Sequence, residues 1–164
     1  MKTALITGVT GQAGLGLDGQ ADGPSGDSPQ TEVRLWGSGR ARREFLHVDD
    51  LAEACLRIMM LTDDDFVDIC AANPPNSGDG PVSFINIGTG EDLTIGQLAD
   101  MVSQVVGFDG PVIWDESKPD GTPQKLLDVS RLKRTGWKPA IDLENGIKSV
   151  YEWYLRYPGG KAPA

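Results

Sequence analysis

The sequence predicts an α/β protein, and three observations support this. From Thr31 onward, short strand-like runs alternate with amphipathic helical patterns. Near the start, the apolar run 3–7 leads into a glycine turn with the spacing used in dinucleotide-binding α/β folds. A length of 164 residues favours one well-formed core over two full domains.

The composition narrows the classes of partner. The chain carries 24 acidic against 15 basic side chains, a net charge of −9, with a pI near 4.5. Nucleic acids and anionic membranes require a basic surface, so we expect neither as a partner. Cys55 and Cys70 show no zinc-type spacing, which predicts reduced thiols, no metal site and a cytoplasmic protein.

The glycine turn over residues 8–14 has G-x-x-G-x-x-G spacing, which lets backbone N–H groups approach a pyrophosphate at a helix N-terminus. The following residues are too rich in glycine, and lack the apolar period, for that helix. We therefore expect residues 1–14 to be a remnant of a dinucleotide-binding domain and residues 15–30 to be a flexible linker. The candidate cofactor-binding residues are Gly8, Thr10, Gly11 and Gly14, although we expect no stable cofactor binding.

The elements then follow in order. We predict a strand over 32–36, a strand-like run over 43–50, and a helix capped by Asp49 or Asp50. The expected core stripe of that helix comprises Leu51, Ala54, Cys55, Ile58 and Met59. The acidic run 62–65 predicts a solvated turn.

Further along, 83–88 and 111–115 are strand candidates. Thr94 and Gln97 form a capping box for a helix that Gly107 ends; its expected core face is Ile95, Leu98, Val102 and Val105 or Val106. A short helix runs through Leu132. Asp142 caps the last helix, which ends before Pro158 and whose expected core face is Leu143, Ile147, Val150 and Tyr154.

The run 117–128 is the most informative stretch. Pro119, Gly121 and Pro123 exclude a helix interior or a central strand and predict a stiff turn. The turn presents both charge signs, as a ligand clamp would, although a solvated turn fits its composition equally well.

An arginine cluster supplies the dense positive charge of this acidic chain. Arg40, Arg42 and Arg43 follow Trp36 and a glycine-rich turn. Guanidinium groups form bidentate hydrogen bonds with phosphate, and an indole can stack against a base or a sugar. Trp36 and the arginine cluster, which we call the corner, therefore suit a diphosphate ligand. The alternative is a solvated loop.

Three blocks of sequence carry a resemblance. They are WGSG at 36–39 with REFLHVDDLA at 43–52, INIGTGED at 85–92 with Thr94 and Ile95, and SKPDGTPQKLLDVSRL at 117–132 followed by Gly136-Trp137. In this order they closely resemble the GDP-L-fucose synthases, a family of extended short-chain dehydrogenase/reductases. The resemblance covers residues 31–157. It implies a truncated Rossmann-type extended reductase, with a GDP-sugar substrate-binding domain at 31–157 and a disordered tail at 158–164.

The resemblance also implies site residues and partners. Trp36, Arg43, Asp120 and Lys125 match substrate-contacting positions, with Asp120 accepting from ribose or base groups and Lys125 pairing with phosphate. Gln124 stands where the family has arginine. The family uses NADP to epimerise and reduce GDP-4-keto-6-deoxymannose to GDP-fucose; it is homodimeric, and we expect the dimer-forming region to be missing here.

No catalytic residue is predicted. The reductase dyad needs Tyr-x-x-x-Lys on a helix, and the run from Tyr157 to Lys161 contains one proline and two glycines that prevent that helix. His47 and Cys55 are interpreted as structural. We expect this chain alone to be inactive. The alternatives are a non-catalytic fragment or interaction module, or a relative of GDP-mannose 4,6-dehydratase, which the first fourteen residues resemble.

Overall fold

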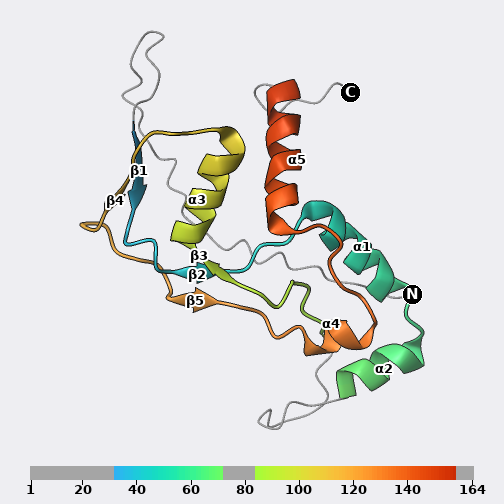
Figure 1. Cartoon of the computed structure of the whole chain (residues 1–164). Helices are drawn as coiled ribbons and strands as arrows, with labels where there is room; N and C mark the ends of the chain where they lie inside the picture. Colours follow the sequence, from blue (N-terminus) through green and yellow to red (C-terminus); the bar gives the residue numbers. More distant parts are fainter. Residues whose placement is uncertain (1–31, 72–83, 158–164) are drawn as a thin grey trace. The chain divides into compact units, whose positions relative to one another are not determined.

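The computed structural model describes residues 32–71 and 84–157 (Figure 1). The predicted remnant, linker and tail, and with them Gly8, Thr10, Gly11 and Gly14, lie outside the described residues. Contacts divide the chain into two compact units within the predicted 31–157 range. Of the described residues, the first unit comprises 32–43 together with 93–125, and the second comprises 44–71, 84–92 and 126–157.

The first unit is built on two small sheets. Strand β1 (Val33–Trp36) pairs in parallel with β4 (Val112–Asp115). Strand β2 (Arg42–Arg43) lies between β3 (Leu93–Thr94), which is antiparallel to it, and β5 (Gln124–Lys125), which is parallel. The predicted strands at 32–36 and 111–115 are confirmed, whereas β5 falls inside the stretch predicted as a loop.

Helix α3 (Ile95–Val106) completes the first unit and follows its predicted signals. Thr94 and Gln97 form the capping box, Gly107 takes the left-handed conformation with φ 71°, and Leu98 is buried. Both caps are satisfied by residues close in sequence, which is why the sequence alone was sufficient to predict them.

The second unit is helical. Its helices are α1 (Val48–Met59), α2 (Asp63–Ala71), α4 (Ser130–Arg134) and α5 (Leu143–Arg156). The core consists of Ala54, Val129, Leu132 and Trp137. Among the described helices, none combines the length and apolar character that crossing a bilayer requires.

Two element predictions for the second unit are wrong. Residues 84–88 of the predicted strand 83–88 form no strand, because a strand needs a neighbour and no described segment pairs with them. The acidic run 62–65 is not a turn but opens α2. There the Thr62 hydroxyl accepts from the Asp65 N–H (3.1 Å), and carboxylates at a helix N-terminus complement its dipole.

The predicted cap and core stripe of α1 also need correction. The cap is His47, whose Nδ1 accepts from the Asp49 N–H. Ala54 is buried as expected, but Leu51 and Met59 of the expected core stripe are exposed. Likewise, Val150 and Tyr154 on the expected core face of α5 are exposed, because no described element covers that part of the helix.

Candidate functional site

The four predicted substrate-binding residues all belong to the first unit. Trp36 ends β1, Arg43 lies on β2, Lys125 lies on β5, and Asp120 belongs to the loop between β4 and β5. The parallel register places Arg43 directly opposite Lys125, so the two strands bring these side chains to one end of the small sheet.

Asp120 fastens the loop to the turn that follows β1. Its Oδ1 accepts from the Ser38 backbone N–H (2.8 Å), and its Oδ2 accepts from the Ser38 hydroxyl (2.6 Å). The preceding Gly37 has φ 83°, a conformation that favours glycine and turns the chain toward the carboxylate. The hydrogen bonds from Ser38 hold the pKa of Asp120 below its ordinary value. Asp120 therefore joins two segments 82 residues apart in the sequence.

Arg43 lies buried beneath the same loop, with 8% of its surface exposed. Its Nη1 donates to the carbonyl oxygens of Thr122 (2.7 Å) and Arg42 (2.6 Å). The loop backbone is close enough that a Cβ at Gly121 would lie 3.2 Å from the Arg43 Nη2. No carboxylate pairs with this guanidinium among residues 32–71 and 84–157. A buried charge without a counter-charge is costly, so the site favours an anion.

Trp36 and Lys118 form the exposed wall of the corner. Half of the surface of Trp36 is accessible, and the Lys118 Nζ lies 5.6 Å from the centre of its ring, a cation–π contact. The Asp115 carboxylate shapes the start of the loop by accepting from the Ser117 hydroxyl (2.5 Å) and N–H (3.1 Å). The hydrogen bond from the Ser117 hydroxyl is the main cause of a lowered Asp115 pKa.

The predicted clamp is thus a structured loop, fixed by Asp115, Asp120 and the Thr122 carbonyl. Lys125 is exposed on β5, and Arg40, between β1 and β2, is exposed as well. The sequence reasoning missed Ser38; its only signal was a hydroxyl between two glycines after a strand. The ligand contacts of Trp36, Arg43, Asp120 and Lys125 remain predictions.

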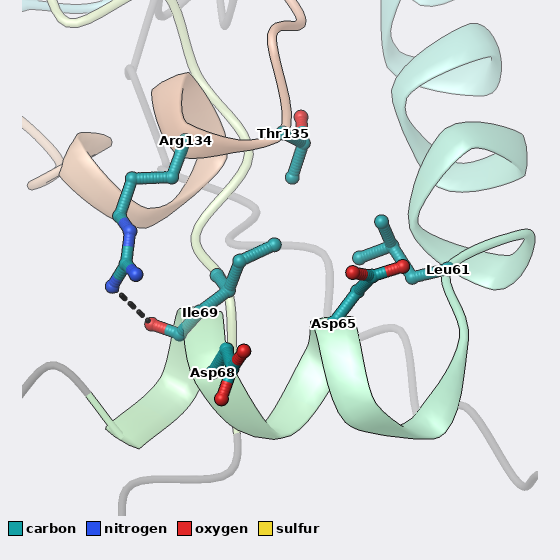
Figure 2. Close-up of a pocket in the computed structure, with 6 residues that line it drawn as sticks. All are labelled: Leu61, Asp65, Asp68, Ile69, Arg134 and Thr135. Atoms are coloured by element: carbon teal, nitrogen blue, oxygen red, sulfur yellow. Dashed lines mark hydrogen bonds between the residues drawn. The ribbon is translucent and has the colours of Figure 1, made fainter.

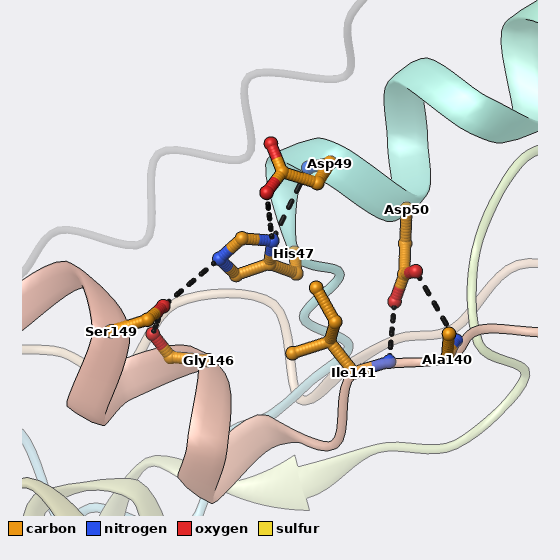
Figure 3. Close-up of polar contacts among 7 residues, drawn as sticks. All are labelled: His47, Asp49, Asp50, Ala140, Ile141, Gly146 and Ser149. Atoms are coloured by element: carbon orange, nitrogen blue, oxygen red, sulfur yellow. Dashed lines mark hydrogen bonds and ion pairs between the residues drawn. The ribbon is translucent and has the colours of Figure 1, made fainter.

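His47 serves the structure of the second unit (Figure 3). Its Nδ1 accepts from the Asp49 N–H (3.2 Å) and lies 3.7 Å from Asp49 Oδ2, and its Nε2 lies 3.2 Å from the Ser149 hydroxyl on α5. Beside it, the buried Asp50 accepts from the backbone N–H groups of Ala140 (3.1 Å) and Ile141 (3.0 Å). These contacts attach the start of α1 to α5 and to the loop before it.

A shallow hollow of about 300 Å³ lies between α2 and α4 (Figure 2). Its lining residues are Leu61, Asp65, Asp68, Ile69, Arg134 and Thr135. Arg134 donates to the Ile69 carbonyl (3.3 Å), and the Thr135 hydroxyl donates to the Leu132 carbonyl (2.7 Å). Since these polar groups are already used within the fold, we assign no ligand to this hollow.

The two cysteines are free thiols. Cys55 is half-buried and Cys70 is buried, and burial raises the pKa of the Cys70 thiol. In the described part of the chain, no three His, Cys, Asp or Glu side chains gather in a way that could hold a metal ion.

Comparison with known proteins relates this geometry to a family. A family model described as "NAD dependent epimerase/dehydratase family" matches residues 20–69. A putative GDP-L-fucose synthase 2 from Arabidopsis thaliana is 48% identical over 124 residues, which cover 76% of this chain and 33% of that protein. The GDP-L-fucose synthase of Escherichia coli K12 is 47% identical over 124 residues, with 76% and 36% covered.

Solved structures show the same relation. The GDP-mannoheptose C4 reductase of Campylobacter jejuni, solved with NADP bound, has 38% identity and a TM-score of 0.60; the match covers 76% of this chain and 35% of that one. The chain therefore spans about a third of the length of the relatives that it matches.

Proposed function

Because the chain belongs to the NAD dependent epimerase/dehydratase family, we propose that its first unit binds the GDP part of a GDP-sugar. The described fold matches about a third of a Rossmann-type extended reductase. The similar relatives are named as GDP-L-fucose synthases. We propose that this chain derives from an enzyme of that kind, which epimerises and reduces GDP-4-keto-6-deoxymannose with NADPH.

The observation that carries the proposal is the buried guanidinium of Arg43. Its bonds go to two carbonyl oxygens, and within the described residues no carboxylate balances its charge. A diphosphate would supply that balance through charge-assisted bonds. Lys125, opposite it on β5, would add a second positive charge toward the same group.

The other wall of the corner suits the uncharged part of a nucleotide. The exposed indole of Trp36 offers a flat apolar face for a base or a sugar ring. Lys118 already occupies a position over that ring, so ligand binding would compete with or extend this contact. Asp120, held by Ser38, fixes the loop and has acceptor capacity left for ribose hydroxyls.

NADP is the cofactor of the similar reductase structure, and we propose that this chain alone does not reduce a substrate. A reductase of this kind needs a tyrosine with a lysine close enough to lower the pKa of the tyrosine. In this sequence the run from Tyr157 to Lys161 has the required spacing, but its proline and two glycines prevent the helix that would bring the two side chains together. We expect no NADPH oxidation when the purified chain is mixed with GDP-4-keto-6-deoxymannose. Steady turnover would contradict this part of the proposal.

Calorimetry with GDP tests the binding proposal. We expect weak binding that Arg43→Ala lowers at least tenfold and that Arg43→Lys restores only in part, because lysine keeps the charge but loses the planar fork. Arg34→Ala is the matched control, since Arg34 is an exposed arginine of the same unit paired with Glu32 (2.9 Å); binding should change less than twofold. Equal losses in both alanine variants would refute a specific role for Arg43.

Limited proteolysis separates the proposal from the alternative of a fragment that binds nothing. If GDP fills the corner, it should slow cleavage of the loop over residues 118–125, while UMP at the same concentration should protect less. Cleavage that is indifferent to GDP would favour the non-binding alternative.

A further inference from the structure

Ser38 presents two hydrogen-bond donors to one carboxylate. Its backbone N–H donates to Asp120 Oδ1 (2.8 Å), and its hydroxyl donates to Asp120 Oδ2 (2.6 Å). The Ser38 hydroxyl oxygen also accepts from the Arg40 N–H (3.3 Å), which leaves the hydroxyl hydrogen to point at the carboxylate. One residue therefore holds Asp120 in the way that the fork of an arginine would, with one bond to each oxygen.

The turn that carries Ser38 is fixed at both of its ends. The Gly37 N–H donates to the carbonyl of Asp115, the last residue of β4 (3.0 Å). The Gly39 carbonyl accepts from the N–H of Gly96 in the first turn of α3 (2.9 Å). Backbone bonds to a strand and to a helix thus set the two donors of Ser38 before any ligand arrives, which is the arrangement that a positioning residue requires.

The two bonds from Ser38 occupy one particular edge of the Asp120 carboxylate. An ionised carboxylate has roughly four acceptor positions, two side by side on its outer edge and one on each flank, pointing away from each other. Because both donors belong to one residue, they can reach both oxygens at once only across the outer edge. The hydrogen bonds from Ser38, chiefly that of its hydroxyl, lower the pKa of Asp120, so the carboxylate is ionised near neutral pH and only accepts.

The occupied edge is the edge that a vicinal diol would use. The two hydroxyls of a ribose are neighbours on one ring, and they can bind both oxygens of a carboxylate together only across its outer edge. Asp120 is exposed, so a ligand can still approach it from a flank. A flank offers one position, and a ribose that binds there brings one hydroxyl to the carboxylate.

We propose that Ser38 is a specificity-determining residue of the GDP site, which restricts Asp120 to one of the two ribose hydroxyls. This inference rests on the proposed binding of GDP by the first unit, and it adds which part of the nucleotide Asp120 recognises. Ser38 acts through Asp120 and is therefore a positioning residue. A serine that only fastened the loop would affect every nucleotide equally, whereas a residue that orients the carboxylate changes the ratio of their affinities.

Calorimetry of the full chain with GDP, 2′-deoxy-GDP and 3′-deoxy-GDP tests the proposal. We expect one of the two deoxy analogues to bind at least fivefold more weakly than GDP and the other to bind within twofold of it. Asp120→Ala should abolish this difference, because the acceptor is gone. In Ser38→Ala only the backbone N–H holds the carboxylate, so the outer edge can turn toward the ligand. The analogue that matched GDP should then bind at least fivefold more weakly than GDP.

Two further variants separate the hydroxyl of Ser38 from other effects of substitution. Ser38→Thr keeps both donors and should keep the wild-type pattern. Ser117→Ala is the matched control, because Ser117 also gives an N–H (3.1 Å) and a hydroxyl (2.5 Å) to one carboxylate, that of Asp115. Whatever its effect on the overall affinity, it should leave the ratio of the two deoxy analogues within twofold of the wild-type ratio. Circular dichroism checks each fold, and Ser38→Cys, a weak donor of similar size, replaces Ser38→Ala if that variant unfolds.

The outcomes distinguish this inference from the proposed function. If GDP binds and both deoxy analogues lose affinity, or neither does, Asp120 does not recognise a single hydroxyl and the inference is overturned, while the binding of GDP stands. The inference is also overturned if Ser38→Ala weakens all three nucleotides by the same factor, because Ser38 would then only fasten the loop. If the chain binds none of the three nucleotides, the proposed function fails and this inference fails with it.

Discussion

The Glu44 carboxylate connects three segments of the second unit, and its removal gives the sharpest stability prediction. Oε1 accepts from the Gly90 N–H (2.6 Å) and from the Thr89 hydroxyl (3.3 Å), and Oε2 accepts from the Leu127 N–H (3.0 Å). Glu44→Ala leaves two partly buried N–H groups without an acceptor. At about 1–3 kcal/mol for each such group, we expect a loss of about 2–6 kcal/mol in the free energy of unfolding.

Gly88 provides a second way to disturb the same carboxylate. A Cβ at this position would lie 2.8 Å from the Glu44 Cδ, so Gly88→Ala must displace the side chain at a cost of about 1–3 kcal/mol. In the Glu44→Ala background the obstacle is gone, and the same substitution should cost less than about 0.5 kcal/mol. The two changes should therefore be strongly non-additive.

Urea denaturation followed by the fluorescence of the buried Trp137 measures both effects. Glu91→Ala is the control, because Glu91 is an exposed carboxylate close in sequence to the same loop, and it should change stability by less than about 0.5 kcal/mol. The reasoning is refuted if the two single losses simply add in the double variant. It is also refuted if Glu44→Ala behaves like the control.

Two further predictions concern the first unit. The hydrogen bonds from Ser38 lower the pKa of Asp120 in the folded protein. These bonds therefore stabilise the loop fully at a pH above the ordinary pKa of an aspartate, near 3.9, and this stabilisation is lost as the pH falls through the lower pKa that Asp120 has in the folded protein. Proteolysis of the loop by pepsin should accelerate over that window, and Asp120→Asn should show fast cleavage without the pH step; a step retained in Asp120→Asn would contradict the assignment. Gly39→Ala and Gly107→Ala share φ near 70°, but only the first adds a Cβ 2.8 Å from the Trp114 ring. Gly107→Ala should cost about 1 kcal/mol and Gly39→Ala about 1–3 kcal/mol more, measured by thermal melts; equal costs would show that the ring moves aside freely.

Elements whose determinants lie within a few residues were predictable. Thr94, Gln97 and Gly107 bound α3 as expected, and Asp142 caps α5 by accepting from the Asn145 N–H (2.9 Å). Each of these signals is a side chain or backbone preference that acts within one turn of helix. Distant parts of the sequence are therefore not needed to predict where these helices begin and end.

Features set by distant segments were not predictable. Strand β5 exists because it meets β2, and residues 84–88 form no strand because no described segment meets them. The helical period correctly predicts an apolar stripe on α1. A period does not show which side of a helix packs against other elements, so the expectation that Leu51 lies in the core is wrong: its side chain is exposed. In the candidate site, charge and proline spacing identified Arg43 and the loop, whereas the contact of Asp120 with Ser38 spans 82 residues and had no local signal.

The hydrogen bonds around His47 fix where its proton resides. The Ser149 hydroxyl donates its hydrogen to the Gly146 carbonyl (2.9 Å), so in the 3.2 Å contact with the imidazole the hydroxyl oxygen must accept and Nε2 must carry the hydrogen. The ring's single lone pair then belongs to Nδ1 and points at the backbone amide of Asp49. Both ring nitrogens of His47 therefore have hydrogen-bond partners within the second unit, which holds the imidazole between the start of α1 and α5.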